Sequence, residues 1–203
     1  MQELIKNTST QRAGFLNRYE NALKYYRNET DITSRNDGKA KLNKDGKDDP
    51  LRHADNRVPS NFYQLLVDQE AGYVATVPPQ IDVGNEKYNE DIAEVLGDDF
   101  ALTVSNLVID ASNAGVAWLH YWIDKDNNFR YAIIPPNQIT PIYSTTLDNK
   151  LLGILRSYKQ LDSDTGKLFT VHEYWNDKEA TFFKQPTSSL NSLEPYNNIT
   201  SYD

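Results

Sequence analysis

The chain has 203 residues, enough to bury a hydrophobic core as one domain with an appendage, and its net charge is −8. That negative balance argues against a free-standing module whose main task is to bind phosphates. No apolar run is long enough to cross a bilayer, the first residues lack the apolar region of a secretory signal, and without cysteine there is no thiol nucleophile or Cys-based zinc site. We therefore expect no membrane partner.

The first predicted element is a helix that ends near Arg27. Thr8, Ser9 or Thr10 can cap it, and apolar residues then recur at spacings of three and four. Residues 28–55 are rich in Asp, Lys, Asn and Gly and nearly devoid of apolar side chains, so burial cannot offset the entropy of ordering them. We expect an N-terminal helix and a mobile polar arm over residues 1–57. Seven Lys or Arg residues against five Asp in residues 35–57 favour a solvated mixed-charge loop over a nucleic-acid contact.

A second helix is predicted from Asn61, which has the spacing of a capping box with Gln64, to about Val77, before the Pro78-Pro79 pair. Its apolar stripe consists of Phe62, Leu65, Leu66, Gln69 and Tyr73. A short extended piece over residues 81–83 and a helix over residues 89–96 follow. In that helix Ile92, Val95 and Leu96 are expected to face inward, with Gly97 as the stop.

Residues 98–143 hold the longest apolar periodic run, which changes from helical to alternating spacing. Asp98 and Asp99 offer an N-cap to a helix whose apolar positions run from Phe100 to Ala111, and Gly115 closes it. Residues 116–123 predict a strand, residues 124–128 a hairpin turn and residues 129–134 the returning strand. The centre of the chain is thus expected to be a helix that leads into an antiparallel hairpin.

Beyond Tyr143 the pattern is that of a β meander. Strands are predicted over residues 151–161, 167–175 and 179–184, with a turn at residues 162–166. Residues 185–203 are polar and rich in Pro, Asn and Ser, which is typical of a linker. The predicted fold class is α+β, with N-terminal helices followed by an antiparallel β meander.

Residues that could carry chemistry are few. His53, His120 and His172 each lack a second histidine at metal-ligand spacing, and His172 and Glu173 point to opposite faces of a strand, so they cannot act locally as a dyad. Asp98 and Asp99 are better explained as helix caps than as a catalytic carboxylate pair. We predict no catalytic residue, no cofactor and no metal, and we interpret His120 as a half-buried strand histidine bonded to a neighbour.

An aromatic cluster on the hairpin offers a binding alternative. Such rings can stack the bases of a single strand, but only Lys125 and Arg130 accompany them, so a core or a subunit interface is the better interpretation. The cluster consists of Trp118, Tyr121, Trp122, Phe129 and Tyr131.

Six short motifs follow one another over about 135 residues. They are residues 25–32 (YYRNETDI), 56–62 (NRVPSNF), 65–79 (ending in Pro-Pro), 96–100 (LGDDF), 110–118 (DASNAGVAW) and 134–143 (IPPNQITPIY), with residues 152–156 (LGILR) and Tyr158 after them. In this order they resemble the portal proteins, or head-to-tail connectors, of tailed bacteriophages, of the type found in siphophages and prophages of Gram-positive bacteria. Asn28 stands where that family usually has Gly, and Asn is the next best residue for a positive φ. Pro78-Pro79 stands where the family usually has G-x-P.

The resemblance implies a structural subunit of a ring, typically of twelve copies, at the capsid vertex. The ring would form the channel for double-stranded DNA packaging and ejection and the head-tail attachment point. The implied partners of the full-length protein are other copies of itself, the terminase large subunit, the head-completion adaptor, the scaffold protein, the major capsid protein and the DNA. The implied locations are the virion and, during assembly, the host cytoplasm. The resemblance implies no enzymatic activity.

Family members run to well over twice this length, so the chain is expected to hold the arm and most of the portal wing. The expected division is an arm over residues 1–57, an α+β wing domain over residues 58–184 and a linker over residues 185–203 toward a stem and clip. The regions that face DNA would lie beyond Asp203, so the nucleic-acid-contacting residues are unknown. An acidic wing fits a channel through which DNA must slide, because strong phosphate binding would hinder passage.

Two other function classes stay open at this point. One is an independent α+β module whose aromatic hairpin binds a peptide, a glycan or single-stranded nucleic acid. The other is a hydrolase whose site is assembled from scattered carboxylates.

Overall fold

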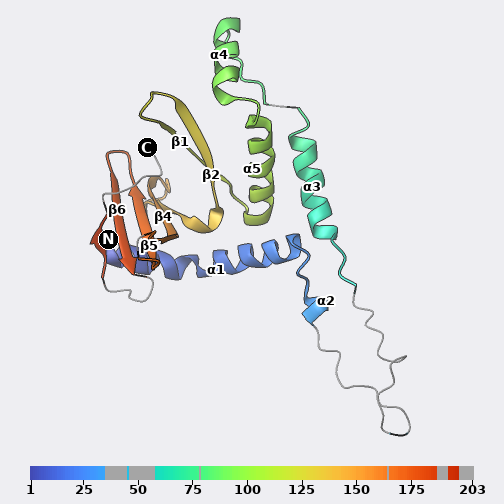
Figure 1. Cartoon of the computed structure of the whole chain (residues 1–203), viewed down its shortest axis with the longest axis vertical. Coiled ribbons are helices and arrows are strands. Elements are labelled where there is room, and N and C mark those ends of the chain that lie inside the picture. The colour runs from blue at the N-terminus through green and yellow to red at the C-terminus, as the bar shows by residue number, and fades with distance from the viewer. Residues whose placement is uncertain (35–44, 46–57, 78, 164, 187–191, 197–203) are drawn as a thin grey trace.

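The computed structural model describes residues 1–34, 45, 58–77, 79–163, 165–186 and 192–196. His53 and, apart from Asp45, the basic stretch of residues 35–57 lie outside the described residues, as does most of the predicted linker. Helices come first, a β-hairpin follows, and an antiparallel sheet ends the described chain (Figure 1). The predicted fold class, α+β with N-terminal helices and a β meander, is confirmed.

Helix α1 (Gln2–Tyr26) runs across the base of the molecule, from beneath the sheet to the other helices (Figure 1). It begins six residues before the predicted caps, so the prediction of a cap at Thr8, Ser9 or Thr10 is wrong. These hydroxyls instead donate to carbonyl oxygens one turn back, Thr8 to Leu4 at 2.7 Å and Ser9 to Lys6 at 2.8 Å. Inside a helix this bond is available to Ser and Thr, so such residues do not by themselves mark a start.

After α1 the chain turns at Asn28, whose φ of 62° is the left-handed conformation expected where the portal motif has Gly. The one-turn helix α2 (Asp31–Ser34) follows. Tyr25 Oη donates to Asp31 Oδ2 at 3.0 Å and holds this turn against the end of α1. Residues 28–34, the first part of the predicted mobile arm, therefore form a defined turn and a short helix.

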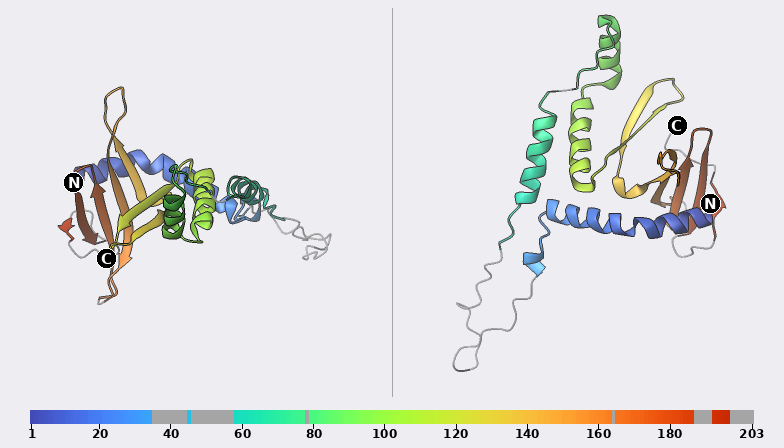
Figure 2. Two further views of the ribbon diagram at one scale, coloured as in Figure 1. Left: turned by 90° about the horizontal axis from the view of Figure 1, so that it is seen from above. Right: turned by 180° about the vertical axis from the view of Figure 1, so that it is seen from behind.

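Helices α3 (Phe62–Val74), α4 (Glu86–Leu96) and α5 (Phe100–Ala114) form the second part of the helical layer, with α3 packed beside α5 (Figures 1 and 2). Asn61 and Asp99 occupy the predicted N-cap positions, but neither side chain accepts a hydrogen bond from a backbone N–H there. The predicted positions are therefore right and the predicted capping bonds are wrong. The Asn61 amide donates to the Gln64 side chain instead. Helix α4 begins earlier than predicted, at the cap residue Asn85, whose side chain accepts from Tyr88 N at 3.4 Å.

The stops of α4 and α5 agree with prediction. Gly97 and Gly115 both have positive φ, 74° and 76°, and each backbone N–H bonds the carbonyl four residues earlier. Val95, expected to face inward, is instead 56% exposed, whereas Ile92 and Leu96 are partly buried. Helix α3 ends at Val74, three residues before the predicted end.

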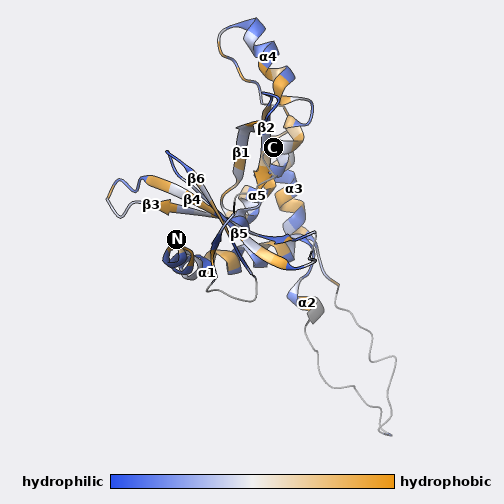
Figure 3. Cartoon of the chain, turned by 60° about the vertical axis from the view of Figure 1, so that its left-hand side comes forward, coloured by the Kyte–Doolittle hydropathy of each residue, from blue (hydrophilic) through white to orange (hydrophobic). Residues whose placement is uncertain are grey.

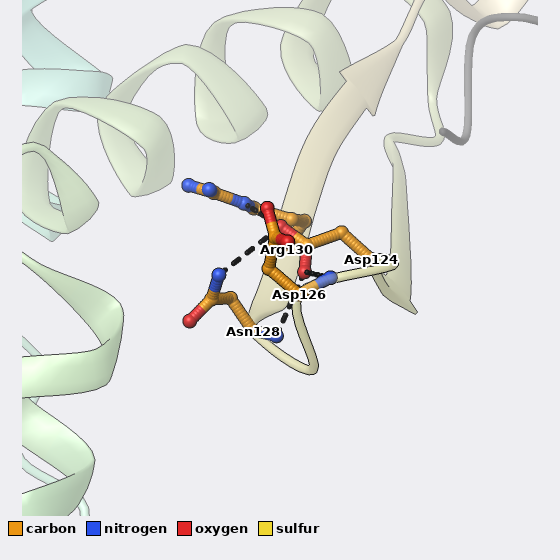
Figure 4. A network of polar contacts seen from close by, with 4 residues as sticks. All are labelled: Asp124, Asp126, Asn128 and Arg130. Atoms are coloured by element: carbon orange, nitrogen blue, oxygen red, sulfur yellow. Dashed lines mark hydrogen bonds and ion pairs between the residues drawn. The ribbon is translucent and has the colours of Figure 1, made fainter.

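The hairpin of β1 (Trp118–Ile123) and β2 (Phe129–Ile134) has Tyr121 opposite Tyr131 and Trp122 opposite Arg130. At its tip the Asp124 carboxylate accepts from the backbone N–H groups of Asp126 and Asn128, at 3.0 and 2.8 Å, and from Arg130 Nε at 2.8 Å (Figure 4). These bonds, with the Asn128 backbone N–H contributing most, lower the pKa of Asp124. The predicted polar turn thus fixes the hairpin through one carboxylate.

A five-stranded antiparallel sheet follows the short 3₁₀ helix η2 (Pro136–Gln138). Its order is β3-β4-β5-β6-β7, the meander that the sequence predicts, although the sequence pattern did not single out β3. Strand β6 continues past the predicted end at residue 184, and Gln185 in it is buried. The strands are β3 (Ile139–Tyr143), β4 (Leu151–Leu161), β5 (Leu168–Trp175), β6 (Ala180–Pro186) and β7 (Glu194–Pro195).

The sheet is covered on both faces, which places the core around its middle strand β5. Val171, His172 and Glu173 are all at most 4% exposed. Strand alternation sends His172 toward α1 and Glu173 toward the hairpin. Arg12 Nη2 of α1 donates to the Pro136 carbonyl oxygen at 2.7 Å and ties the helix to the start of the sheet.

Candidate functional site

A buried polar cluster lies on the face of the sheet that the hairpin covers. Glu173 is fully buried, and both its carboxylate oxygens lie 3.5 Å from Arg156 Nη1. Trp175 Nε1 donates to Glu173 Oε2 at 3.3 Å, and Arg156 Nε donates to Gln138 Oε1 at 3.1 Å. The Arg156 guanidinium also lies 4.4 Å from the Tyr158 ring centroid. Every one of these groups has a protein partner, as a structural cluster requires.

His120 lies at the edge of this cluster. Its ring is 5.6 Å from that of Trp122, nearly parallel, and 5.3 Å from that of Trp175. Burial lowers the pKa of His120, against the opposing effect of the nearby Glu173 carboxylate. The imidazole lies between two indole rings and acts as a packing element, so the half-buried position on the strand agrees with the prediction, whereas the expected bond to a neighbour stays a prediction.

His172 faces the other side of the sheet, where it makes a contact that sequence reasoning missed. Its Nδ1 lies 2.8 Å from Ser157 Oγ, because Ser157 and His172 are directly opposite each other on β4 and β5. Such a pair depends on strand register, which residue spacing along the chain does not reveal. Burial lowers the pKa of His172.

Among the described residues, Ser157 and His172 lack the third member of a hydrolytic triad. In a triad the histidine contacts the serine through one ring nitrogen and an orienting carboxylate through the other. Here Nδ1 contacts the serine, and Nε2 has no hydrogen-bond partner among the described residues. Glu173, the adjacent carboxylate, is engaged on the opposite face, so the predicted orientation of His172 and Glu173 to opposite faces of the strand is confirmed.

A cavity of about 600 Å³ lies between the N-terminal half of α1 and the sheet. Its walls include Ile5, Leu16 and Leu155, and the Ser157–His172 pair forms part of its polar lining. Within the described parts of the chain, no three His, Cys, Asp or Glu side chains come together as metal ligands. No described helix is both long enough and apolar enough to span a membrane.

The aromatic residues of the hairpin point in different directions. Trp118 lines a small pocket against the sheet with Trp175, whereas Tyr131 packs edge to face on Phe100 at 5.7 Å and donates to the Leu96 carbonyl oxygen at 2.5 Å. Tyr121 is 69% exposed, and Phe129 stacks beside it at 6.0 Å. The rings therefore do not form one open platform on which successive bases could stack.

Apolar surface is exposed elsewhere, most of all on α3. The stripe that the sequence predicts there points to solvent, and Val67 and Ala71 on the opposite side of the helix are the buried residues. Phe62, Leu66 and Tyr73 are 67%, 64% and 87% exposed. Figure 3 shows α3 at one side of the molecule, and β3 and β4 project on the other.

The described residues thus combine buried polar groups that have protein partners with large exposed apolar surfaces, which is typical of structural proteins that associate with other chains. The chain belongs to the family described as phage portal protein, SPP1 Gp6-like, whose model matches residues 5–201. This confirms the resemblance to a portal protein of a phage of Gram-positive bacteria.

Two relatives show how much of such a protein the chain represents. The portal protein of Clostridium phage phiCD119 is 39% identical over 170 residues, which are 77% of this chain and 37% of that protein. The portal protein of Bacillus phage SPP1 is 28% identical over 129 residues, 61% of this chain and 26% of that protein. The matched region thus covers little more than a third of the first relative and about a quarter of the second.

Proposed function

We propose that this chain is the arm and wing portion of a portal subunit that assembles with copies of itself into a ring at the capsid vertex. The observation that carries the proposal is the family match over residues 5–201, nearly the whole chain. The ring, typically of twelve copies, forms the channel for double-stranded DNA packaging and ejection and the head-tail attachment point. Residues 1–57 are the arm, residues 58–184 the wing domain and residues 185–203 a linker toward a stem and clip.

The partners that follow are proposals of the same kind. They are the terminase large subunit, the head-completion adaptor, the scaffold and major capsid proteins and the DNA that passes through the ring. The virion is the final location, and assembly takes place in the host cytoplasm. The net charge of −8 supports a wing that stays away from the DNA path, since phosphate contacts would slow sliding.

The protein acts in this proposal without catalysis of its own. Support comes from the described residues, in which His120 is packed between rings and His172 contacts a serine without an orienting carboxylate. The variant His120→Gln tests the point, because a packing role predicts nearly normal yields of DNA-filled particles. Loss of particle formation by a variant with unchanged circular dichroism and melting temperature would assign His120 a chemical role.

A genetic experiment tests the function itself. A nonsense codon early in the gene, in a phage or prophage that carries this sequence, should leave heads that contain no DNase-protected genome and no attached tails. Supplying the full-length protein in trans should restore both, and a synonymous change at the same codon is the control. Normal amounts of protected DNA and of tailed particles from the nonsense mutant would refute the portal role.

A further inference from the structure

His172 is buried between the sheet and α1, and only one of its ring nitrogens has a hydrogen-bond partner among the described residues. The residue is 4% exposed, and its Nδ1 lies 2.8 Å from Ser157 Oγ. Its Nε2 is shielded from solvent and bonds no described group. A neutral imidazole tolerates this arrangement at small cost, whereas both nitrogens of an imidazolium carry a proton that needs an acceptor. Protonation in this position therefore creates a buried charge and a buried N–H without a partner, which are both unfavourable.

The side chains around His172 offer little negative charge to a protonated imidazole. The titratable groups that line the cavity from α1 or share the sheet face of His172 are Glu3, Lys6, Arg12, Lys159 and Tyr174. Glu3 is the one acid in this described set, against three cations. Strands β3 and β6 add the uncharged lining residues Thr140 and Gln185, and Glu173 faces the opposite side of the sheet. A charge on His172 therefore meets more repulsion than attraction while α1 covers it.

Helix α1 has different neighbours at its two ends. Its first half lies over the sheet, separated from it by the cavity of about 600 Å³, and Arg12 Nη2 donates to the Pro136 carbonyl oxygen. Its second half lies against α3 and α5 (Figures 1 and 2). There Tyr19 is 5% exposed, and Tyr26 Oη donates to Asp68 Oδ1 at 2.8 Å. The second half is thus anchored in the helical layer, whereas the first half rests on a sheet face with a large cavity beneath it.

Gly14 lies between these two halves, in the interior of an unbroken helix. A Cβ added at Gly14 would find open space, and its φ is not positive, so neither close packing nor an unusual conformation requires glycine here. Apart from proline, glycine is the poorest helix former, because its backbone loses the most entropy on ordering. Gly14 is therefore the point at which α1 bends most easily.

We propose that residues 2–13 form a strap over the sheet that protonation of His172 releases, with Gly14 as the hinge. In the released form the imidazolium is hydrated, its Nε2–H donates to water, and the cavity wall at Leu155 is open to solvent. Stability of the closed form follows from the same contacts at neutral pH, where His172 is uncharged. The device belongs to the fold of this chain and does not depend on the portal role.

The direction of the pH effect follows from the burial of His172. Burial lowers the pKa of His172 in the closed form, whereas the released side chain has the ordinary histidine pKa of about 6.5. The released form therefore takes up the proton first as the pH falls below that value. Between pH 7 and pH 5 the ratio of released to closed chains is expected to rise by about tenfold.

Thiol labelling measures the release, because the chain contains no cysteine of its own. Thr8→Cys places a thiol on the strap at a position that is 8% exposed, and Ala71→Cys places one on α3 at a position that is 2% exposed. Each variant is labelled with a bulky fluorescein maleimide. Its rate is divided into that of the same variant unfolded in urea at the same pH, which removes the pH dependence of the thiol itself. The quotient is the protection of that position.

Local release and global unfolding give different results in this assay. Thr8→Cys is expected to be at least about tenfold less protected than Ala71→Cys, because a strap opens more often than the whole chain unfolds. Its labelling should also be nearly independent of low urea concentrations, since lifting the strap exposes little surface, whereas labelling of Ala71→Cys should accelerate. Equal protection and equal urea dependence at the two positions would mean global unfolding and would overturn the proposal.

The pH dependence identifies the trigger. Protection of Thr8→Cys is expected to fall about tenfold from pH 7 to pH 5. Adding His172→Asn, which keeps a polar side chain opposite Ser157 and takes up no proton, should remove this fall, and circular dichroism checks that the variant is folded. Protection that does not change with pH in Thr8→Cys alone, or that falls equally with His172→Asn, overturns His172 as the trigger.

A glycine pair tests the hinge without altering His172. In the Thr8→Cys chain, Gly14→Ala should raise protection by about fivefold at both pH values, because alanine makes bending at this position less favourable. The matched control is Gly72→Ala in α3, where an added Cβ also finds open space, and it should leave the protection of Thr8→Cys unchanged. An equal effect of the two glycine variants would overturn the hinge at Gly14.

Discussion

The buried pair of Glu173 and Arg156 supports the most specific stability prediction. The Glu173 side chain is 0% exposed and that of Arg156 is 19% exposed, so neither charge can regain full hydration when its partner is removed. Breaking a buried ion pair from one side costs about 3–5 kcal/mol. The variant Glu173→Ala also leaves Trp175 Nε1 without the carboxylate at 3.3 Å, so we place the loss of unfolding free energy within that range.

The assay is urea unfolding followed by tryptophan fluorescence, with thermal melting as a second probe. For a protein of this size about 1 kcal/mol shifts the melting temperature by about 2–4 °C, so Glu173→Ala should lower it by roughly 6–20 °C. The matched control is Glu179→Ala, an exposed glutamate beside the same sheet, for which a change within about 0.5 kcal/mol is expected.

Replacing both partners completes the test. The double variant Glu173→Leu with Arg156→Met removes both charges at once and should be markedly more stable than Glu173→Ala, because no uncompensated charge is left inside. A Glu173→Ala variant as stable as the Glu179→Ala control would refute the reasoning, since it would mean that Arg156 is solvated well enough without its partner.

Three further predictions concern backbone geometry and pH. Gly115→Val should lower the free energy of unfolding by at least about 1–2 kcal/mol and impair folding or assembly. The cause is the φ of +76°, which is unfavourable for valine, because an added Cβ would meet no other atom within 4 Å. Gly115→Asn should cost clearly less in the same urea titration. Gly153→Ala should cost about 1–3 kcal/mol, since its Cβ would lie 2.8 Å from the Trp175 carbonyl oxygen, whereas Gly72→Ala, with open space around it, should be neutral or stabilising. Burial lowers the pKa of His172, so its contribution to stability is complete above about pH 6.5 and declines as the pH falls below that value, where the unfolded chain takes up the proton first. His172→Asn should therefore flatten the fall in unfolding free energy measured between pH 7 and pH 5; an unchanged slope would contradict this cause.

Some elements were predictable because their signals are local. Gly115 ends α5 in the left-handed conformation, the polar turn at Asp124 closes the hairpin, and β4 has the predicted bounds Leu151–Leu161. Helix starts were predicted less well, because a hydroxyl or carboxylate can serve as a cap or bond elsewhere. Neither Thr8 nor Asp99 makes the predicted capping bond: the first lies inside a helix, and the second occupies a cap position without bonding a backbone N–H.

The sequence by itself determined the fold class, through a change from helical to alternating apolar spacing, and the family, through the order of its motifs. Only the tertiary structure decided which apolar residues are core. The stripe of Phe62, Leu66 and Tyr73 has the period of a buried helix face, but the neighbours of α3 cover its other side. Periodicity identifies a face that avoids water and cannot say whether the same chain or another one covers it. The pairings of Ser157 with His172 and of Arg156 with Glu173 likewise depend on strand register, which is fixed by contacts between residues far apart along the chain.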